Sequence, residues 1–334
     1  MKIIEFCDTT LRDGEQAPGN TMKPKDKLLI AKKLENIGVN VIEAGFPASS
    51  KEDFEAIKLI SSHLKKATVC SFARCVEKDI DIANESTKGA KNRMLMIFYA
   101  ISDIHLKNKY NTNRKDAMEK IKNSIRYSKQ YFKRIKFGLE DATRADPKYL
   151  HQVINLLLNE GVDTIALGDT TGWITPLETF KLVKNVVYQV NGKVKISIHC
   201  HNDLGMATAN TLSAIMAGVD EVDTTVNGIG ERAGNTPFEE IVVSLVVRKD
   251  IFKRKINIKL NALMPLSELV YKIINRTPSH EKPIVGVNAF RHESGVHIDG
   301  IKKDPSTYEI FNPKKNWTQA RIFIWKTFKQ EMTC

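Results

Sequence analysis

The stretch Gly161-Val162-Asp163-Thr164-Ile165-Ala166-Leu167 joins a glycine turn to an apolar run, and it decides the fold class. The same turn returns as Gly38-Val39-Asn40 and as Gly218-Val219-Asp220, each time between a helical pattern and a strand-like run. Glycine directly after a helix is typical of a left-handed C-cap, because it has no Cβ to oppose a positive φ. The repeat therefore predicts a recurring helix-to-strand connection.

Strand-like runs alternate with helical patterns along most of the chain. Pro24 and Gly38 bracket one expected helix, and the capping box Thr175-Pro176-Leu177-Glu178 opens another. The eight strand-like runs span residues 3–8, 40–45, 68–73, 94–99, 135–139, 164–167, 195–199 and 221–226. Eight such alternations in about 250 residues predict a (β/α)8 TIM barrel, with a doubly wound open sheet as the alternative. We expect the barrel in residues 1–262 and a truncated C-terminal lid or linker subdomain in residues 263–334.

Composition narrows the class of protein. The net charge is +12, but the lysines are spread over helical patterns and not interleaved with aromatic residues, which disfavours nucleic-acid binding. The chain has no run of about 18 apolar residues and no signal-peptide pattern, so no membrane partner is expected. The five cysteines are odd in number and scattered: Cys7, Cys70, Cys75, Cys200 and Cys334. They favour a reducing cytoplasm.

Polar residues follow every predicted strand, where a barrel carries its chemistry. His199 and His201 end one strand and point to the same face, because strand side chains alternate. With Asp8 and Asn235 they form a set of oxygen and imidazole donors for a divalent cation, and Mg²⁺, Mn²⁺ and Zn²⁺ all remain possible. The alternative is a pair of buried, hydrogen-bonded histidines.

Two further features belong to the predicted barrel mouth. Arg12 lies four residues beyond a strand end, where it can stabilise a developing oxyanion. The glycine-rich run 228–234 is one residue too long for a dinucleotide fingerprint and follows the last strand, so a Rossmann site is rejected. A backbone turn near an anionic carrier group remains plausible for this run.

Three motifs together identify a family resemblance. Residues 8–16 (DTTLRDGEQ), 199–205 (HCHNDLG) and 227–235 (NGIGERAGN) resemble the signatures of the 2-isopropylmalate synthase and homocitrate synthase family. That family is related to the metal-dependent barrel of hydroxymethylglutaryl-CoA lyase, and the similarity covers roughly residues 1–312. It implies a Claisen condensation of acetyl-CoA with a 2-oxo acid, followed by thioester hydrolysis. Segments 44–50, 102–107 and 140–144 are more similar to isopropylmalate synthases, which implies 2-oxoisovalerate and leucine biosynthesis.

The resemblance also implies roles for individual residues. A divalent metal would be held by Asp8, His199, His201 and Asn235. Arg12 would act at the keto oxygen, and His297, with Tyr308 nearby, would be the general base reaching into the partner's barrel of a homodimer. The remaining expected substrate, CoA or catalytic contacts are Asp13, Gln16, Glu140, His105, Thr170, Gly228, Gly230, Glu231 and Gly234.

The chain departs from the family pattern in two places. Ile298 stands where the family usually has Gln, and residues 321–329 resemble a damaged version of a Gly-Lys-His-Ser-Gly stretch before the chain stops. The leucine-sensing domain of full-length isopropylmalate synthases is expected to be absent. Alternatives are therefore a homocitrate-type or citramalate-type synthase, a retro-aldol lyase of the same fold, and an inactive metal-binding paralogue.

Overall fold

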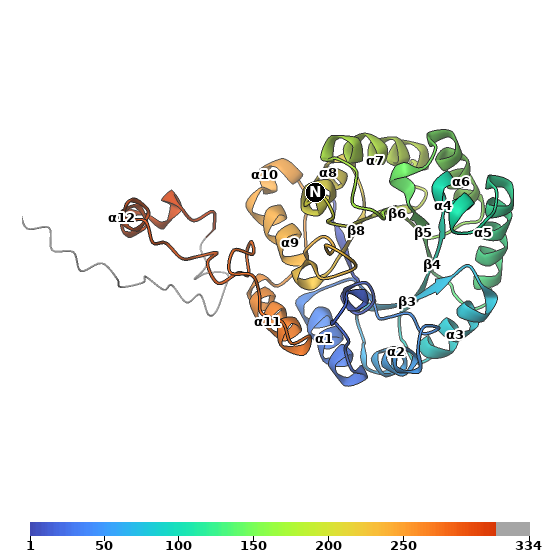
Figure 1. Cartoon of the computed structure of the whole chain (residues 1–334), viewed down its shortest axis with the longest axis horizontal. Helices are drawn as coiled ribbons and strands as arrows, with labels where there is room; N and C mark the ends of the chain where they lie inside the picture. Colours follow the sequence, from blue (N-terminus) through green and yellow to red (C-terminus); the bar gives the residue numbers. More distant parts are fainter. Residues whose placement is uncertain (312–334) are drawn as a thin grey trace, which may run out of the picture.

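The computed structural model describes residues 1–311, and within them eight parallel strands close into a barrel in chain order (Figure 1). The predicted (β/α)8 barrel is confirmed, and the alternative of an open doubly wound sheet is wrong. The strands are β1 (Glu5–Asp8), β2 (Val41–Glu43), β3 (Thr68–Arg74), β4 (Arg93–Ala100), β5 (Ile135–Glu140), β6 (Thr164–Asp169), β7 (Lys195–Cys200) and β8 (Glu221–Thr224). Pairing of Glu5–Asp8 with Glu221–Thr224 closes the ring.

Helices form a ring outside the strands (Figure 1). The helices of the described residues are α1 (Pro24–Ile37), α2 (Lys51–His63), α3 (Glu77–Thr87), α4 (Asp103–Asn108), α5 (Arg114–Ser128), α6 (Pro147–Asn159), α7 (Pro176–Val190), α8 (Ala207–Ala217), α9 (Phe238–Val247), α10 (Lys249–Phe252), α11 (Leu263–Ile273) and α12 (Gly295–Lys303). None of these helices is both long and apolar enough to cross a membrane.

The signals that place helix ends in the sequence act as expected. Pro24 is the first residue of α1, and Gly38 caps it with φ +111° while its N–H donates to the carbonyls of Leu34 and Glu35. Thr175 and Glu178 form the predicted capping box at the start of α7. Local chemistry thus fixes both ends of α1 and the start of α7.

Strand alternation divides the core into two parts. One side of each strand packs against the helices, as when Phe6 of β1 meets Phe238 of α9 edge to face at 5.3 Å. The other side points into the barrel, where Cys7 packs with Cys70 and Met96. Cys7 and Cys200 are both buried. Successive residues of β1 therefore point to opposite sides of the barrel wall. This alternation determines which of their side chains face the barrel interior and which face the helices.

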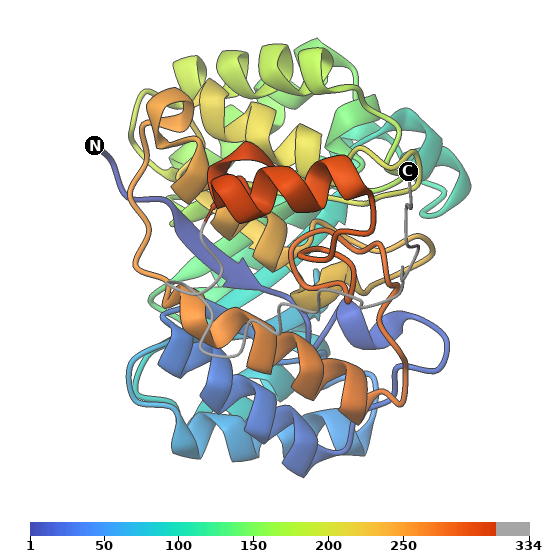
Figure 2. The same cartoon turned by 90° about the vertical axis from the view of Figure 1, so that its left-hand side faces the viewer.

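Two helices follow residue 262, and only the second of them lies outside the barrel. Helix α11 packs along α1 and places Leu266 and Val270 in the main core (Figure 2). Helix α12 lies beyond α11, outside the ring of helices (Figure 1). The altered stretch 321–329 falls outside the described residues.

Candidate active site

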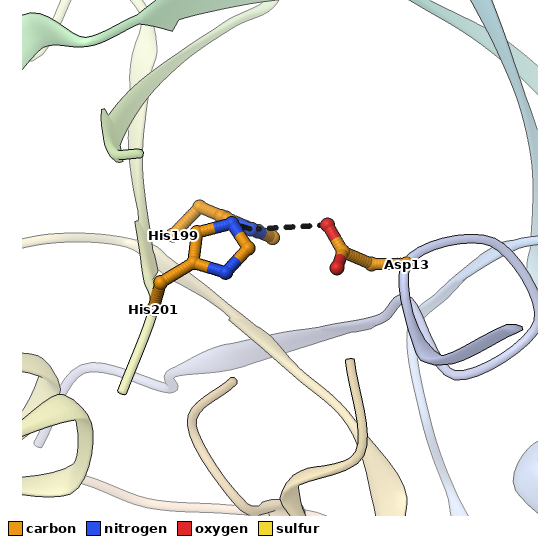
Figure 3. Close-up of side chains that lie close together, drawn as sticks. All are labelled: Asp13, His199 and His201. Atoms are coloured by element: carbon orange, nitrogen blue, oxygen red, sulfur yellow. Dashed lines mark hydrogen bonds and ion pairs between the residues drawn. The ribbon is translucent and has the colours of Figure 1, made fainter. Parts of the chain in front are cut away.

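Two imidazoles and one carboxylate meet at the carboxyl end of the barrel. His199 belongs to β7 and His201 follows the strand, and their Nε2 atoms lie 3.4 Å apart. The Oδ2 atom of Asp13 lies 3.4 Å from His199 Nε2, so the carboxylate faces both rings (Figure 3). One donor atom from each of the three residues lies within 4.8 Å of the others. This spacing fits a single divalent cation between them.

The carboxylate in this group is Asp13, whereas the sequence had suggested Asp8. On β1, Asp8 shares the face of Phe6, which packs against the helix layer. Its Oδ1 accepts a hydrogen bond from the backbone N–H of Thr10 at 3.0 Å, and the side chain is fully buried. Asp13 follows β1 in the loop at the barrel mouth and can turn back toward β7. Asp13 therefore replaces Asp8 in the ligand set that we propose below.

Asn235 is held beside the cluster by backbone pairing. Asn235 and His201 form an isolated antiparallel bridge, and the Asn202 N–H donates to the Gly234 carbonyl at 2.9 Å. Asn235 Nδ2 donates to Asp13 Oδ1 at 3.0 Å. Its Oδ1 is buried without a hydrogen-bond partner among the described residues. An orphan amide oxygen beside two imidazoles and a carboxylate fits the donor set expected of a divalent metal site.

The glycine-rich run 228–234 supports Asp13 and Asn235. The backbone N–H of Glu231 lies 3.3 Å from Asp13 Oδ1 and donates to it. A Cβ on Gly230 would lie 2.2 Å from Asn235 Nδ2, and one on Gly234 would lie 2.1 Å from the Gly228 carbonyl oxygen. These contacts explain the glycines by close packing around the cluster. The expectation that the run lies near CoA stays a prediction.

Arg12 lies between the cluster and Glu43, a buried acid to which the sequence assigned no role. Its Nη1 donates to Asp13 Oδ2 at 2.6 Å and approaches Gln16 Oε1 at 3.4 Å. Its Nε donates to Glu43, and its guanidinium lies 4.3 Å from the centre of the Phe72 ring. The guanidinium is thereby fixed in orientation, with one edge toward the Asp13–His199–His201 cluster.

Charges in the cluster are strongly coupled. Burial would raise the pKa of Asp13, but Arg12 and then His199 outweigh it and hold that pKa well below its usual range. Burial would lower the pKa of His199, but Asp13 and Asp223 raise it to about 9. Burial, followed by the charge of His199, lowers the pKa of His201 to about 4. The cluster thus favours one proton on the histidine pair, held by His199 beside the Asp13 carboxylate.

A cleft of about 130 Å³ opens directly onto the cluster. Its floor contains Arg12, Asp13 and the histidine pair, while its wall is largely apolar. Phe72 stacks on Phe98 with ring centres 4.6 Å apart. A Cβ on Gly138 would lie 2.5 Å from the Met96 methyl group, so the glycine makes room for that side chain. The lining residues other than these are Leu139, Glu140, Ala166, Gly168 and Thr170.

Glu140 and Thr170 line this cleft, as expected for substrate contacts. Both Glu140 oxygens accept hydrogen bonds from Lys109 Nζ, at 2.7 and 2.8 Å. His105 Nδ1 lies 3.9 Å from Glu140 Oε1, so His105 is near the cleft without lining it. Thr170 Oγ1 accepts from the Asp141 N–H at 2.8 Å. The Glu140 carboxylate is therefore paired with the Lys109 ammonium.

His297 and Tyr308 lie elsewhere. His297 belongs to α12, and its ring stacks on that of Tyr308 with centres 4.1 Å apart. Neither residue lines the cleft, and α12 lies outside the barrel ring (Figure 1). The structure thus pairs the two expected catalytic residues with each other but does not bring them to the cluster of the same chain.

A larger cavity, of about 480 Å³, occupies the opposite end of the barrel. Its charged residues are largely paired: Lys195 binds Glu5 at 2.7 Å, and Arg134 donates to Thr68 at 3.0 Å. It lies at the amino ends of the strands, where barrels are not known to carry catalysis. The smaller cleft is therefore the candidate active site.

The sequence did not identify the apolar wall or the buried Asp223 as parts of the site, and it placed Glu43 at the barrel mouth without assigning it a role. Glu43 ends β2 after two apolar residues and is fully buried. A charged residue directly after an apolar strand run was the available signal. In the sequence, Phe72 and Met96 cannot be distinguished from ordinary core residues, because apolar residues alternate along a strand in the same way whether they line a cleft or fill a barrel interior.

The chain belongs to the HMGL-like family, which it matches over residues 3–270. Residues 284–327 match a second family, described as homocitrate synthase post-HMGL domain-like, and residues 312–327 of this match lie outside the described part. The chain is 46% identical over 315 residues to 2-isopropylmalate synthase of Lysinibacillus sphaericus. It is 45% identical over 327 residues to 2-isopropylmalate synthase of Pyrococcus furiosus.

These matches cover 94% and 97% of this chain, but the chain spans only 62% and 65% of the length of those two relatives. Among solved structures, hydroxymethylglutaryl-CoA lyase of Pseudomonas aeruginosa aligns with a TM-score of 0.70 at 21% identity. The alignment covers 84% of this chain and 95% of that one. At this identity the structural likeness supports the barrel fold alone. The resemblance inferred from the three motifs is confirmed at the level of the family.

Proposed function

We propose that this chain catalyses the condensation of acetyl-CoA with a 2-oxo acid, with 2-oxoisovalerate as the substrate and 2-isopropylmalate as the product. One observation carries the proposal: the Arg12 guanidinium lies against the Asp13–His199–His201 cluster at the floor of an apolar-walled cleft. This floor combines a site for a divalent cation with a fixed positive charge. Both are suited to a keto oxygen that becomes negatively charged.

A divalent metal would be held by Asp13, His199, His201 and Asn235. Mg²⁺, Mn²⁺ and Zn²⁺ are all compatible with this mixture of oxygen and nitrogen donors. When bound, the metal supplies Lewis-acid polarisation of the 2-oxo acid.

Arg12 would stabilise the charge that develops on the keto oxygen as the new carbon–carbon bond forms. His297, with Tyr308 beside it, would remove a proton from the acetyl methyl group and hold it at an imidazole nitrogen. The resulting enolate carbon attacks the keto carbon, the C=O π bond breaks, and the keto oxygen becomes an alkoxide that takes up a proton to give the hydroxyl group of the product. Water then cleaves the thioester, which leaves a carboxylate and free CoA thiol.

Substrate choice would depend on the cleft wall. Phe72, Met96 and Phe98 favour a branched apolar side chain over a second carboxylate, because burial of an unpaired charge among them is costly. This supports 2-oxoisovalerate over the 2-oxoglutarate used by a homocitrate-type synthase. Glu140, Thr170, His105 and Gln16 would contact or orient the substrate, and the run 228–234 would lie near CoA.

The position of α12 supports a homodimer in which each lid serves the partner's barrel. His297 and Tyr308 lie outside the ring of their own barrel, so a second chain would complete the site. We further propose that the protein works in the cytoplasm in leucine biosynthesis, without nucleic-acid or membrane partners. The domain division at residues 262 and 263 is part of the same proposal.

A free-thiol assay tests the proposed activity. The Mn²⁺-loaded protein is incubated with acetyl-CoA and, in separate reactions, 2-oxoisovalerate, 2-oxobutyrate, pyruvate or 2-oxoglutarate. We expect the fastest thiol release with 2-oxoisovalerate. A preference for pyruvate would assign a citramalate-type synthase, and one for 2-oxoglutarate a homocitrate-type synthase. No release with any acid would leave a lyase or an inactive metal-binding paralogue.

A further inference from the structure

A second charged cluster lies inside the barrel, next to the proposed metal site. Lys136 of β5 donates to Glu221 Oε1 at 2.7 Å and to Asp223 Oδ1 at 2.6 Å, both on β8. Ser197 of β7 donates to Asp223 Oδ1 at 2.8 Å. These four side chains are at most 2% exposed. Burial of these charged groups costs desolvation free energy, so stabilisation of the fold is a weak explanation for the cluster. Its contact with a proposed metal ligand offers another explanation.

Asp223 connects this cluster to His199. While its Oδ1 binds Lys136, its Oδ2 is buried without a hydrogen-bond partner among the described residues and lies 3.4 Å from His199 Nδ1. The other ring nitrogen of His199, Nε2, faces Asp13 and His201. The two sides of one imidazole therefore face two different partners, the buried acid and the proposed metal site.

The acids of this cluster do not themselves suit a second metal. Cys7, Glu221 and Asp223 lie close enough together to hold one. However, the Lys136 ammonium binds both carboxylates and occupies the place of a cation. Burial also raises the pKa of the Cys7 thiol well above its usual value, which disfavours the thiolate form that binds metals.

We propose that Asp223 is a positioning residue that makes His199 a metal ligand through Nε2. Its Oδ2 accepts a hydrogen bond from the His199 Nδ1–H group, which leaves the Nε2 lone pair free for the cation. Lys136 anchors Oδ1 and so fixes the direction of Oδ2. A histidine ligand whose second nitrogen donates to a carboxylate is oriented and made more basic by it. This inference rests on the metal site of the proposed function.

The substitution Asp223→Asn tests this role. Because the Lys136 ammonium needs an acceptor, the new amide turns its oxygen to Lys136 and its NH2 group to His199 Nδ1. The ring must then accept at Nδ1 and carry its hydrogen on Nε2, which is the wrong tautomer for metal binding. We expect Mn²⁺ affinity, measured by the electron paramagnetic resonance of free Mn²⁺, to fall at least about tenfold.

Glu221→Gln is the matched control. It removes one negative charge from the same ammonium in the same buried layer. No hydrogen bond or ion pair joins Glu221 to His199 in the described part of the chain. We expect its Mn²⁺ affinity to stay within about twofold of the wild type. Thermal unfolding of both variants separates a loss of fold from a loss of affinity.

Equal Mn²⁺ affinities in the two folded variants would overturn the inference while leaving the metal site intact. A wild-type protein that bound no Mn²⁺ would overturn the metal site and the inference together. If Asp223→Asn does not fold, ¹⁵N-histidine spectra of the Zn²⁺-loaded wild type decide the matter. These spectra should show a proton on Nδ1 of His199. The signal is assigned to His199 because it should disappear in His199→Gln. A His199 Nδ1 without a proton would refute the role of Asp223.

Discussion

Asp8 and Asp13 lie five residues apart, in a motif whose two aspartates are chemically alike, yet they face different parts of the fold. Asp8 points toward the helix layer on the side of Phe6, whereas Asp13 turns from the loop toward His199. The sequence places both at the barrel mouth, and only the three-dimensional course of the loop distinguishes them. Their difference gives the most direct mutational test of the ligand set.

Asp13→Asn should weaken Mn²⁺ binding by at least tenfold, because it removes the anionic oxygen facing both histidines. Asp8→Asn should leave Mn²⁺ affinity unchanged, since Asp8 bonds to the Thr10 backbone instead. Isothermal titration of metal-free protein with Mn²⁺ measures both. A loss of affinity in Asp8→Asn equal to that in Asp13→Asn would restore Asp8 to the ligand set.

Asp8 should instead affect the pH dependence of stability. Burial raises its pKa to about 7 in the folded chain, whereas an aspartate in an unfolded chain titrates near about 3.9. Between these values the unfolded chain has released a proton that the folded chain keeps, so rising pH favours unfolding. The asparagine of Asp8→Asn does not titrate.

Between pH 5 and pH 7, the free energy of unfolding of Asp8→Asn should therefore rise relative to that of the wild type, by on the order of 1 kcal/mol per pH unit. Urea unfolding of both proteins at several pH values gives the difference, in which the other titrating groups cancel. A difference that stays constant with pH would contradict the buried, protonated state of Asp8.

At the scale of elements, the strands were predictable because their patterns are local. All eight lie where the apolar alternation places them, and the glycines at 38, 161 and 218 all adopt the expected positive φ. The last strand was expected to reach residue 226 but ends at Thr224. There Asn227 adopts φ +65° and its side chain bonds to Ser267 of α11, a tertiary contact that no local pattern contains.

The candidate site was predictable only in part, for the same reason. His199, His201, Arg12 and Asn235 come from strand ends and motifs that the sequence displays. The inward direction of Asp13 and the support given by Glu43 and Asp223 depend on contacts between distant segments. Local patterns predict which residues reach the barrel mouth, but not which of them meet.

A substitution in the run 228–234 tests whether this loop positions Asp13 and Asn235. In Gly230→Ala the new Cβ would press on Asn235 Nδ2 at 2.2 Å and on Asp13 Oδ1 at 3.2 Å. Displacement of these two side chains should lower Mn²⁺ affinity about tenfold or more, while circular dichroism shows a folded barrel. Gly89→Ala is the control, because its Cβ would meet only ordinary contacts of 3.6 Å or more. Unchanged affinity in Gly230→Ala would mean that the loop does not position the ligands.

In the molecule as a whole, the residues of the proposed site lie in two separate parts. The Asp13–His199–His201 cluster and Arg12 belong to the barrel, whereas His297 and Tyr308 belong to the segment around α12 that lies outside it. A site assembled from both parts needs either a movement of this segment or a second chain. We expect a second chain to complete the site.

His297→Ala should reduce kcat by about 10²- to 10⁴-fold without a matching rise in KM for the 2-oxo acid, since a general base acts in the transition state. Mixing inactive His297→Ala with inactive His201→Ala, after partial unfolding and reassembly, should restore part of the activity. Mixed dimers then contain one barrel with intact ligands facing an intact lid. Failure to recover any activity, with mixed dimers shown by mass spectrometry, would rule out the shared site.

We expect the Asp13–His199–His201 cluster to hold the one metal ion that condensation requires. The most direct measurement is the initial rate of CoA release from acetyl-CoA and 2-oxoisovalerate, as metal-free protein is titrated with Mn²⁺. We predict that the rate rises from background and saturates at one bound ion per chain, and that His201→Ala stays at background throughout. A rate independent of added metal, or a His201→Ala variant as active as the wild type, would show that condensation does not depend on a metal held by this cluster.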